Sequence, residues 1–407
     1  MSTRVRRRVL GGSLLLLLAA GAGAAVQLER PIPAPTVHGQ LASSYTVLGS
    51  AARLPWPAEG QAALYLSQFG WLGATGTEGS VPVASVTKIM TALVVLRAHP
   101  LTLGMAGPTV PVSAADFSLY QSERAVGDSV VPVEAGETFS ELQLLEGLLL
   151  PSGDNLAVLL ADWQAGSEAA FVEQMDQLAV TLHLDHTRFA DSSGLDPGSV
   201  SCARDLVALA TVAMRDPVFA SIVAMPTVTL PLAGVVHNYN PLLGKDGVIG
   251  VKTGWTAAAM GCLVFAASER IDGHPVQLIG AVLGQPGGPA SALLAAGQEA
   301  AGLLASAAGE LHWLRLPAGV AAVGRVTSSW AHRVAVGVAR PIPMVGPSGA
   351  RLSLRLHVRR LRTPLRRGAE VGTLTVATPG GFSFRERVVA SRKLGGPSWW
   401  WRLTRPF

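Results

Sequence analysis

Long apolar runs broken by short polar segments fill the first three quarters of the chain. Over 81–96 most positions after Pro82 are apolar, which predicts a helix buried on almost all sides. Apolar runs over 142–150 and 156–161 flank the polar segment Pro151-Ser152-Gly153-Asp154-Asn155, and this predicts a helix, a tight loop and a second helix. Amphipathic spacing predicts another helix over 203–214, and a run rich in small residues predicts one over 290–308.

Strand patterns come late, over 247–252, 262–267 and 276–283. Adjacent strands with helices before and after them predict an α/β or α+β domain with an antiparallel sheet over 41–309. Beyond it, apolar and mostly basic residues alternate over 351–359, and 371–376 with 382–389 predict a hairpin. We therefore expect a small β-rich C-terminal module over 310–396.

Both ends of the chain have patterns that suit a membrane. Four arginines precede an apolar run over 9–26, so residues 1–30 are expected to be either a cleaved secretion signal or a retained membrane anchor. Residues 27–40 include Pro31, Pro33, Pro35 and Gly39, and this composition predicts an extended linker. The tail 397–407 is rich in Trp and Arg and favours a membrane surface, or else docks on the β-rich module. We expect an extracytoplasmic protein, secreted or anchored at the cell envelope.

Composition and charge exclude several classes of function. Hydrophobic residues at 49% and charged residues at 14% exclude a disordered chain. The net charge of +5 conceals an acidic segment over 31–309 and a basic one over 310–407, so it indicates no nucleic-acid partner. Cys202 and Cys262 are expected either to pair or to remain buried thiols. The sequence has no Cys-x-x-Cys and no His-Glu-x-x-His, so we predict no metal and no cofactor.

The candidate chemistry begins with lysine, which occurs four times against twenty-eight arginines. Lys88 follows Ser85 by three residues at the start of the predicted buried helix, so both side chains share one face. A neutral buried amine can take a proton from a hydroxyl, whereas arginine cannot. Lys252-Thr253-Gly254 follows a predicted strand: its first two residues suit a carboxylate, and its glycine allows a close backbone approach. Each motif alone is weak, but the two with a Ser-Gly-Asp-Asn loop between them favour one functional site.

These segments carry a family resemblance. Ala84-Ser85-Val86-Thr87-Lys88-Ile89 resembles the nucleophile segment of D-alanyl-D-alanine carboxypeptidases, the low-molecular-mass penicillin-binding proteins with SxxK, SxN and KTG motifs. Residues 148–155 and 246–256 are similar to the second and third motifs, and 189–195, 201–206 and 238–244 to further stretches of the family. The resemblance covers most of 41–309 and implies a β-lactamase/transpeptidase-like catalytic domain with a helical subdomain.

The resemblance implies a serine peptidase that removes the terminal D-alanine from peptidoglycan stem peptides ending in D-Ala-D-Ala. Ser85 is then the nucleophile, Lys88 its base, and Ser152 the relay of a proton to the leaving amine. The backbone N–H groups of Ser85 and Trp255 form the oxyanion hole. β-Lactam antibiotics are expected to inhibit by acylating Ser85. The residues expected to bind substrate are Asp154, Asn155, Lys252, Thr253, Gly254 and Trp255.

One position departs from the family pattern. The third place of the second motif is usually Asn, and here it is Asp154, with Asn155 next. Either a small shift presents Asn155, or Asp154 lines the site and favours the charged form of Lys88, which makes a poorer base. We expect Asp154 to line the site.

Two other functions stay open. One is a catalytically silenced cell-wall-binding protein of the same fold. The other is a β-lactamase, although 188–193 lacks the glutamate of a Glu-x-x-x-Asn motif that drives deacylation. An α/β-hydrolase is excluded, because the sequence has no Gly-x-Ser-x-Gly.

Overall fold

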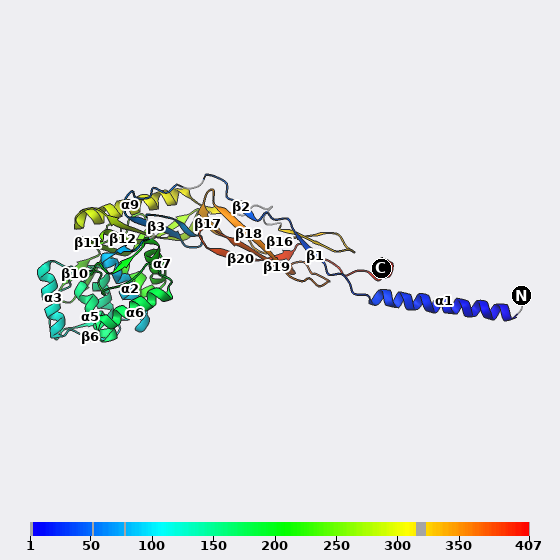
Figure 1. Cartoon of the computed structure of the whole chain (residues 1–407), viewed down its shortest axis with the longest axis horizontal. Helices are drawn as coiled ribbons and strands as arrows, with labels where there is room; N and C mark the ends of the chain where they lie inside the picture. Colours follow the sequence, from blue (N-terminus) through cyan, green and yellow to red (C-terminus); the bar gives the residue numbers. More distant parts are fainter. Residues whose placement is uncertain (1–2, 51–52, 77–78, 315–322, 407) are drawn as a thin grey trace.

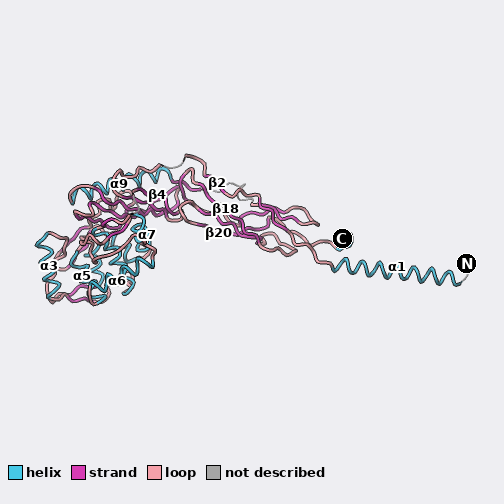
Figure 2. The backbone as a smooth tube through the Cα atoms, viewed as in Figure 1, coloured by secondary structure: helices cyan, strands magenta, loops and turns pink. Residues whose placement is uncertain are grey.

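The structure is a computed structural model that describes residues 3–50, 53–76, 79–314 and 323–406. Figure 1 shows an elongated molecule, with a globular part that holds most helices at one end and a strand-rich part beside it. Helix α1 (Thr3–Glu29) extends from the far end of the strand-rich part. Figure 2 shows that strands run through both parts, whereas helices gather mainly in the first.

A five-stranded antiparallel sheet forms the centre of the globular part, in the order β11-β12-β13-β3-β4. Its strands are β3 (Gln61–Leu66), β4 (Gly70–Thr75), β11 (Val248–Thr256), β12 (Met260–Ile271) and β13 (His274–Gln285). On β12, Val264 and Ala266 contact the helical core, while Leu263, Phe265 and Ala267 face the opposite side. Both faces are therefore buried, which explains why these strands are continuous apolar runs.

Helices cover the two faces of this sheet. The long α9 (Pro289–Glu310) packs on β12 and β13 from one side, and α7 (Ala203–Ala213) packs on β13 and β3 from the other. The remaining elements of the helical part are α3 (Ala114–Val126), α4 (Glu141–Leu149), α5 (Asp154–Ala165), α6 (Glu168–Thr181) and α8 (Pro217–Val223), with the strand pairs β6 (Thr109–Pro111) and β7 (Thr138–Ser140), and β9 (Thr227–Leu230) and β10 (Gly234–His237).

The predicted central helix begins later than its apolar pattern suggests. Val81–Pro82 form strand β5, which pairs with β8 (Val200–Ser201), and Ala84–Thr87 form the 3-10 turn η1. Helix α2 then runs over Lys88–Ala98, with every residue from Lys88 to Leu96 buried. Ala84 has φ 50°, which a right-handed helix cannot contain. Ser85 therefore lies in a tight turn before the helix.

A second antiparallel sheet of seven strands forms the rest of the molecule, in the order β1-β15-β16-β20-β19-β18-β2. Residues 27–40, expected to be a linker, contribute β1, because Thr36–Gly39 pair with Gly324–Thr327. The predicted hairpin is formed by β19 and β20. The strands are β1 (Thr36–Gly39), β2 (Ser44–Thr46), β15 (Gly324–Thr327), β16 (Val334–Val338), β18 (Arg351–Val358), β19 (Glu370–Ala377) and β20 (Ser383–Ala390), with the separate pair β14 (Leu311–Leu314) and β17 (Met344–Pro347).

The two sheets are joined by a continuous hydrophobic cluster that includes Leu64 and Phe265 from the first and Leu352 and Val388 from the second. The tip of the β19–β20 hairpin also bonds to the β3–β4 hairpin: Thr378 Oγ1 donates to Phe69 O, and Trp71 N–H donates to Gly380 O at 2.9 Å. The strand-rich part is thus packed firmly against the β4 edge of the five-stranded sheet.

The two chain ends meet at the far end of the second sheet. The Arg405 guanidinium, just after α11 (Trp399–Thr404), donates to Pro31 O at 3.0 Å and to Arg30 O at 2.7 Å. By length and composition no single helix of the described residues could cross a membrane, and the only bent pair that passes, α7 with α8, turns by 113°. A shorter apolar helix covers Ser13–Glu29.

Candidate active site

A cavity of about 580 Å³ lies between the start of α2, the α4–α5 loop and the β11 edge of the sheet. Ser85, Ser152 and Asp154 line it from the helical side, and Thr253, Gly254 and Trp255 line it from β11. The three sequence motifs, which span residues 85–254, are thus brought together around one space.

Lys88 lies behind Ser85 and Asp154, two residues that line this cavity, and is closed to solvent. Its Nζ donates to Ser85 Oγ at 3.0 Å, to Asp154 Oδ1 at 2.5 Å and to Ser193 O at 2.8 Å. Asp154 Oδ2 accepts in turn from Ser129 N–H at 3.1 Å. The amine is therefore held in one position, with Ser85 Oγ as its partner on the side of the cavity.

Gly254 brings β11 against the turn that carries Ser85. A Cβ atom built on Gly254 would lie 2.9 Å from Ser85 N and 3.0 Å from both Val83 O and Val86 N. Real Cβ atoms essentially never come that close to such atoms, so only glycine fits here without displacing the turn.

The polar residues of the second motif point to different places. Ser152 has φ 64°, and its Oγ is buried with no hydrogen-bond partner among the described residues. Asp154 lines the cavity, as expected. Asn155 does not: its Oδ1 accepts from Val131 N–H at 3.0 Å and its Nδ2 donates to Val131 O at 2.9 Å. The amide of Asn155 instead fastens the segment around residue 131 to the start of α5.

The residues of the third motif also differ in whether they line the cavity. Thr253 lines the cavity, whereas Lys252 lies behind it with Nζ donating to Thr253 O at 3.0 Å. Burial, followed by the nearby charge of Lys88, lowers the pKa of Lys252 well below its ordinary value. Trp255 lines the cavity, and its Nε1 donates to Gly287 O at 3.1 Å.

One segment of the site has no role assigned from the sequence. The Asp191 carboxylate accepts from Ser193 Oγ at 2.7 Å, Gly194 N–H at 2.9 Å and Leu195 N–H at 2.8 Å, and this fixes the loop that presents Ser193 O to Lys88. A Cβ atom on Gly194 would lie 1.9 Å from Ala84 O, so the loop lies directly against the Ser85 turn. In the sequence, the only sign that this loop belongs to the site was the resemblance of 189–195 to the family, and it did not show that Ser193 O contacts Lys88.

Further carboxyl groups surround the ion pair. Burial, and then the charges of Asp154 and Asp128, raise the pKa of Glu123 to about 7. Burial and the charge of Asp154 also raise the pKa of Asp128, which lines the cavity. With a pKa of about 7, Glu123 carries less negative charge near neutral pH than an ordinary glutamate does.

Neither cysteine forms a disulfide. Cys202 and Cys262 are both free and buried, and burial raises their thiol pKa values to about 11 and about 12. Among the described residues one group of potential metal ligands comes together, His186, Cys202 and Asp205. The Asp205 carboxylate already accepts from His186 N–H and Thr187 Oγ1, both at 2.8 Å, and a protonated thiol is a poor ligand, so these residues fit a metal ion badly.

The fold and site define a penicillin-binding protein architecture, which confirms the predicted transpeptidase-like fold. The crystal structure of penicillin binding protein 6B from Escherichia coli is similar over 81% of this chain and 96% of that chain, with a TM-score of 0.60 and 26% identity. The D-alanyl-D-alanine carboxypeptidase family matches residues 72–287, and the chain belongs to this family.

Relatives with a named activity cover part of the chain. A D-alanyl-D-alanine carboxypeptidase of Mycobacterium tuberculosis is 38% identical over 195 residues, which are 46% of this chain and 62% of the relative. A D-alanyl-D-alanine carboxypeptidase of Streptomyces is 37% identical over 206 residues, which are 46% of this chain and 67% of the relative. The chain thus spans about two thirds of the length of these relatives.

Proposed function

We propose that the protein is a serine D-Ala-D-Ala carboxypeptidase that removes the terminal D-alanine from peptidoglycan stem peptides at the cell envelope. The observation that carries the proposal is the 3.0 Å contact between Lys88 Nζ and Ser85 Oγ at the wall of the cavity. An uncharged amine at this distance can take the hydroxyl proton. Family membership supports the same reaction.

In the proposed reaction Ser85 Oγ attacks the carbonyl carbon of the penultimate D-alanine, and its proton passes to Lys88 Nζ. The backbone N–H groups of Ser85 and Trp255 hold the oxyanion, a type of contact that lowers a barrier by about 3 kcal/mol. The C–N bond then breaks, and Ser152 relays the proton from Lys88 to the leaving amine. Water hydrolyses the acyl ester and restores Ser85.

The cavity wall suits an extended peptide. β11 is an edge strand, and among the described residues no strand pairs with its second edge, where an extended peptide could add as a further strand. We assign Thr253 to the terminal carboxylate of the substrate, with the amine of Lys252 behind it. Asp154 faces the peptide from the opposite wall, whereas the contacts of Asn155 with Val131 leave it no part in binding. The family match gives no support to a silenced wall-binding protein or to a β-lactamase.

Labelling with a fluorescent penicillin tests the nucleophile. The full chain in detergent should be labelled covalently, and Ser85→Ala should abolish the label, while Ser118→Ala, an exposed serine of α3, should not. The wild type should release D-alanine from a pentapeptide stem, and Ser85→Ala should not. Labelling that persists in Ser85→Ala, or a labelled wild type that releases no D-alanine, would overturn the proposal.

We also propose that both chain ends hold the protein on the envelope membrane. The apolar side chains Leu14–Leu18 of α1 are 60–73% exposed, and Trp399 and Trp400 of α11 are 68% and 60% exposed. Arg405 bonds to Gln27 O and Arg30 O, so α11 lies at the C-terminal end of α1, on the same end of the molecule as the exposed leucines. Indole rings favour the depth of lipid headgroups.

Quenching by brominated lipid tests this arrangement. Trp fluorescence of the full chain in vesicles should fall when phosphatidylcholine carries bromine near its headgroups. Trp399→Phe with Trp400→Phe should remove most of this quenching, whereas Trp163→Phe on α5 should leave it unchanged. Equal quenching in the double variant and the wild type would place these two indoles outside the membrane.

A further inference from the structure

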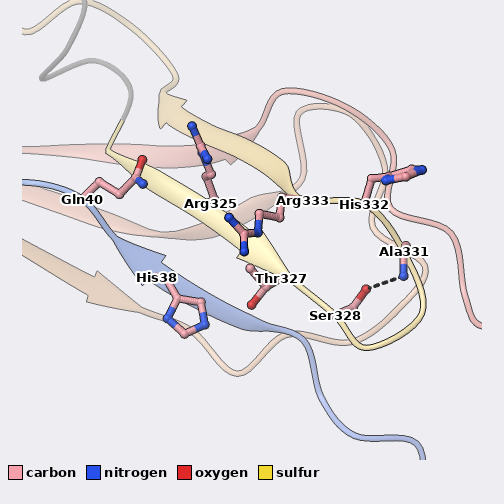
Figure 3. A pocket seen from close by; sticks show the side chains of 8 residues that line it. All are labelled: His38, Gln40, Arg325, Thr327, Ser328, Ala331, His332 and Arg333. Atoms are coloured by element: carbon pink, nitrogen blue, oxygen red, sulfur yellow. Dashed lines mark hydrogen bonds between the residues drawn. The ribbon is translucent and has the colours of Figure 1, made fainter. Parts of the chain in front are cut away.

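A cavity of about 820 Å³ lies far from the active site, on the solvent face of the seven-stranded sheet. Figure 3 shows its lining side chains, which come from β1, β15 and the loop that leads to β16. The ones that matter chemically are His38, Arg325, Thr327, Ser328, His332 and Arg333. Nothing in the proposed peptidase reaction uses them.

The strand register brings these side chains together. His38 lies directly opposite Arg325, and Thr36 lies opposite Thr327. On β15 the alternate residues Gly324 and Val326 are buried, so Arg325 and Thr327 face solvent. Val326 pairs with Val334, which places Arg333 on the same face as Thr327. The cavity is thus built by the pairing of β1 with β15, two segments almost three hundred residues apart in the chain.

The cavity carries positive charge without an opposing carboxylate. Its lining includes two guanidinium groups and two imidazoles and no Asp or Glu. Neither Arg325 nor Arg333 forms an ion pair with any carboxylate in the described residues, whereas Arg359 on the same sheet pairs with Glu370 at 3.0 Å. Segment 310–407 contains seventeen basic and three acidic residues, so its surroundings add to this positive potential.

Its polar groups are partly ordered before any ligand arrives. Thr36 Oγ1 lies 3.1 Å from His38 Nε2 and 3.0 Å from Thr327 Oγ1, which fixes the imidazole and one hydroxyl. Ser328 Oγ accepts from Ala331 N–H at 3.2 Å and shapes the loop that carries His332. Forked guanidinium donors with hydroxyl and ring N–H groups from several strands suit an anion with three or four acceptor oxygens, that is, a phosphate group.

The loop of this cavity also contacts the chain end proposed to lie at the membrane. Trp330, two residues after Ser328, packs edge-on against Trp401 of α11 with ring centroids 5.5 Å apart. Its Nε1 donates to Gly395 O at 2.9 Å. A phosphate that reaches the cavity can therefore belong to an anionic lipid headgroup as well as to a soluble phosphate ester.

We propose that the cavity between β1, β15 and the β15–β16 loop binds a phosphate group, held by Arg325 and Arg333 with His38 and Thr327. This second site is independent of the peptidase reaction. Only the suggestion that the phosphate belongs to a lipid headgroup rests on the membrane orientation proposed above.

The test uses the full chain in phosphatidylcholine nanodiscs, with the ring signals of His38 and His332 followed by NMR. Inorganic phosphate should shift both signals in a saturable manner. Arg325→Gln with Arg333→Gln should weaken this binding at least tenfold. The matched control, Arg355→Gln with Arg385→Gln, removes the same charge from β18 and β20 outside the cavity and should bind phosphate nearly as the wild type does.

A second arm replaces soluble phosphate with phosphatidylglycerol in the nanodisc. Shifts of the His38 and His332 signals with this lipid identify a headgroup as the ligand, and shifts with inorganic phosphate alone identify a soluble one. The proposal fails if neither source shifts these signals, or if the control pair weakens binding as much as the cavity pair. Penicillin labelling of each variant checks its fold separately, so this failure is distinct from failure of the peptidase proposal.

Discussion

Lys88 and Asp154 form an ion pair closed to solvent, with Nζ 2.5 Å from Oδ1 and side chains that are 0% and 2% exposed. The same Nζ lies 3.0 Å from Ser85 Oγ. A carboxylate beside an amine favours the charged ammonium, and only the uncharged amine can take the proton of Ser85. The residue that departs from the family pattern therefore contacts the group whose protonation controls the reaction.

Asp154→Asn should make acylation less dependent on high pH. Asp154→Asn removes the carboxylate that forms the ion pair with Lys88 Nζ, so the acid limb of the pH–rate profile should move to lower pH. The rate of acylation by a fluorescent penicillin, measured from pH 5 to 9, checks this, with the exposed Asp185→Asn as control. An acid limb that stays in place would show that Asp154 does not set the protonation of Lys88.

Lys88→Arg should nearly abolish acylation while the protein stays folded. Arginine keeps the positive charge beside Asp154 but cannot give up its proton at usable pH, so we expect a loss of about a thousandfold or more. Lys245→Arg, in which the lysine Nζ donates to Pro241 O at 2.9 Å and does not line the cavity, should retain the wild-type rate. Acylation of Lys88→Arg within tenfold of wild type would mean that another group is the base.

The site was predictable where its chemistry is local in sequence. Ser85 and Lys88 are three residues apart, and Thr253 and Gly254 follow a strong strand pattern. Each motif alone was weak, but the two motifs with the Ser-Gly-Asp-Asn loop between them, and the family resemblance, indicated these residues. The orientation of Asn155 was not predictable, because neighbouring residues at the start of a helix point in different directions and packing selects one. Ser193 was missed because a backbone carbonyl carries no signal in its side chain, and it lies 105 residues from Lys88.

The same distinction applies to the fold: elements with a local apolar pattern were predictable, and pairings between distant segments were not. Helices α2, α7 and α9 and strands β12 and β13 follow from local apolar patterns. Strand β1 does not, because its four residues find their partner in β15, and no local pattern marks that pairing. β3 likewise joins the sheet through β13, more than two hundred residues later. Pairing over such separations depends on the whole folded chain.

Gly254→Ala should impair acylation without unfolding the protein. The added methyl would lie 2.9 Å from Ser85 N, so either β11 or the Ser85 turn must shift. We expect the acylation rate to fall at least tenfold, because a displacement of about 1 Å at a nucleophile is that costly. Gly302→Ala on α9, whose added methyl meets nothing within 4 Å, is the matched control. Equal rates in the two variants would argue against a tight contact at Gly254.

Glu141, the first residue of α4, is a buried carboxyl group away from the active site. Its side chain is 0% exposed, and neither carboxyl oxygen has a hydrogen-bond partner among the described residues. Burial raises its pKa from 4.5 to about 7. Between these values the folded protein keeps a proton that the unfolded chain has lost, so the free energy of unfolding falls as the pH rises through that window.

Glu141→Gln should remove this loss, because the amide stays neutral at every pH. Near pH 4 both proteins hold an uncharged side chain at this position, and their free energies of unfolding should be similar. At pH 8 the variant should be more stable by about 2 kcal/mol, since the wild type must bury a charge or take up a proton. Denaturant unfolding at both pH values measures the difference, with Glu173→Gln on the exposed side of α6 as control. If the variant's advantage is the same at pH 4 and pH 8, it comes from packing, and burial of a charge at Glu141 is not the cause.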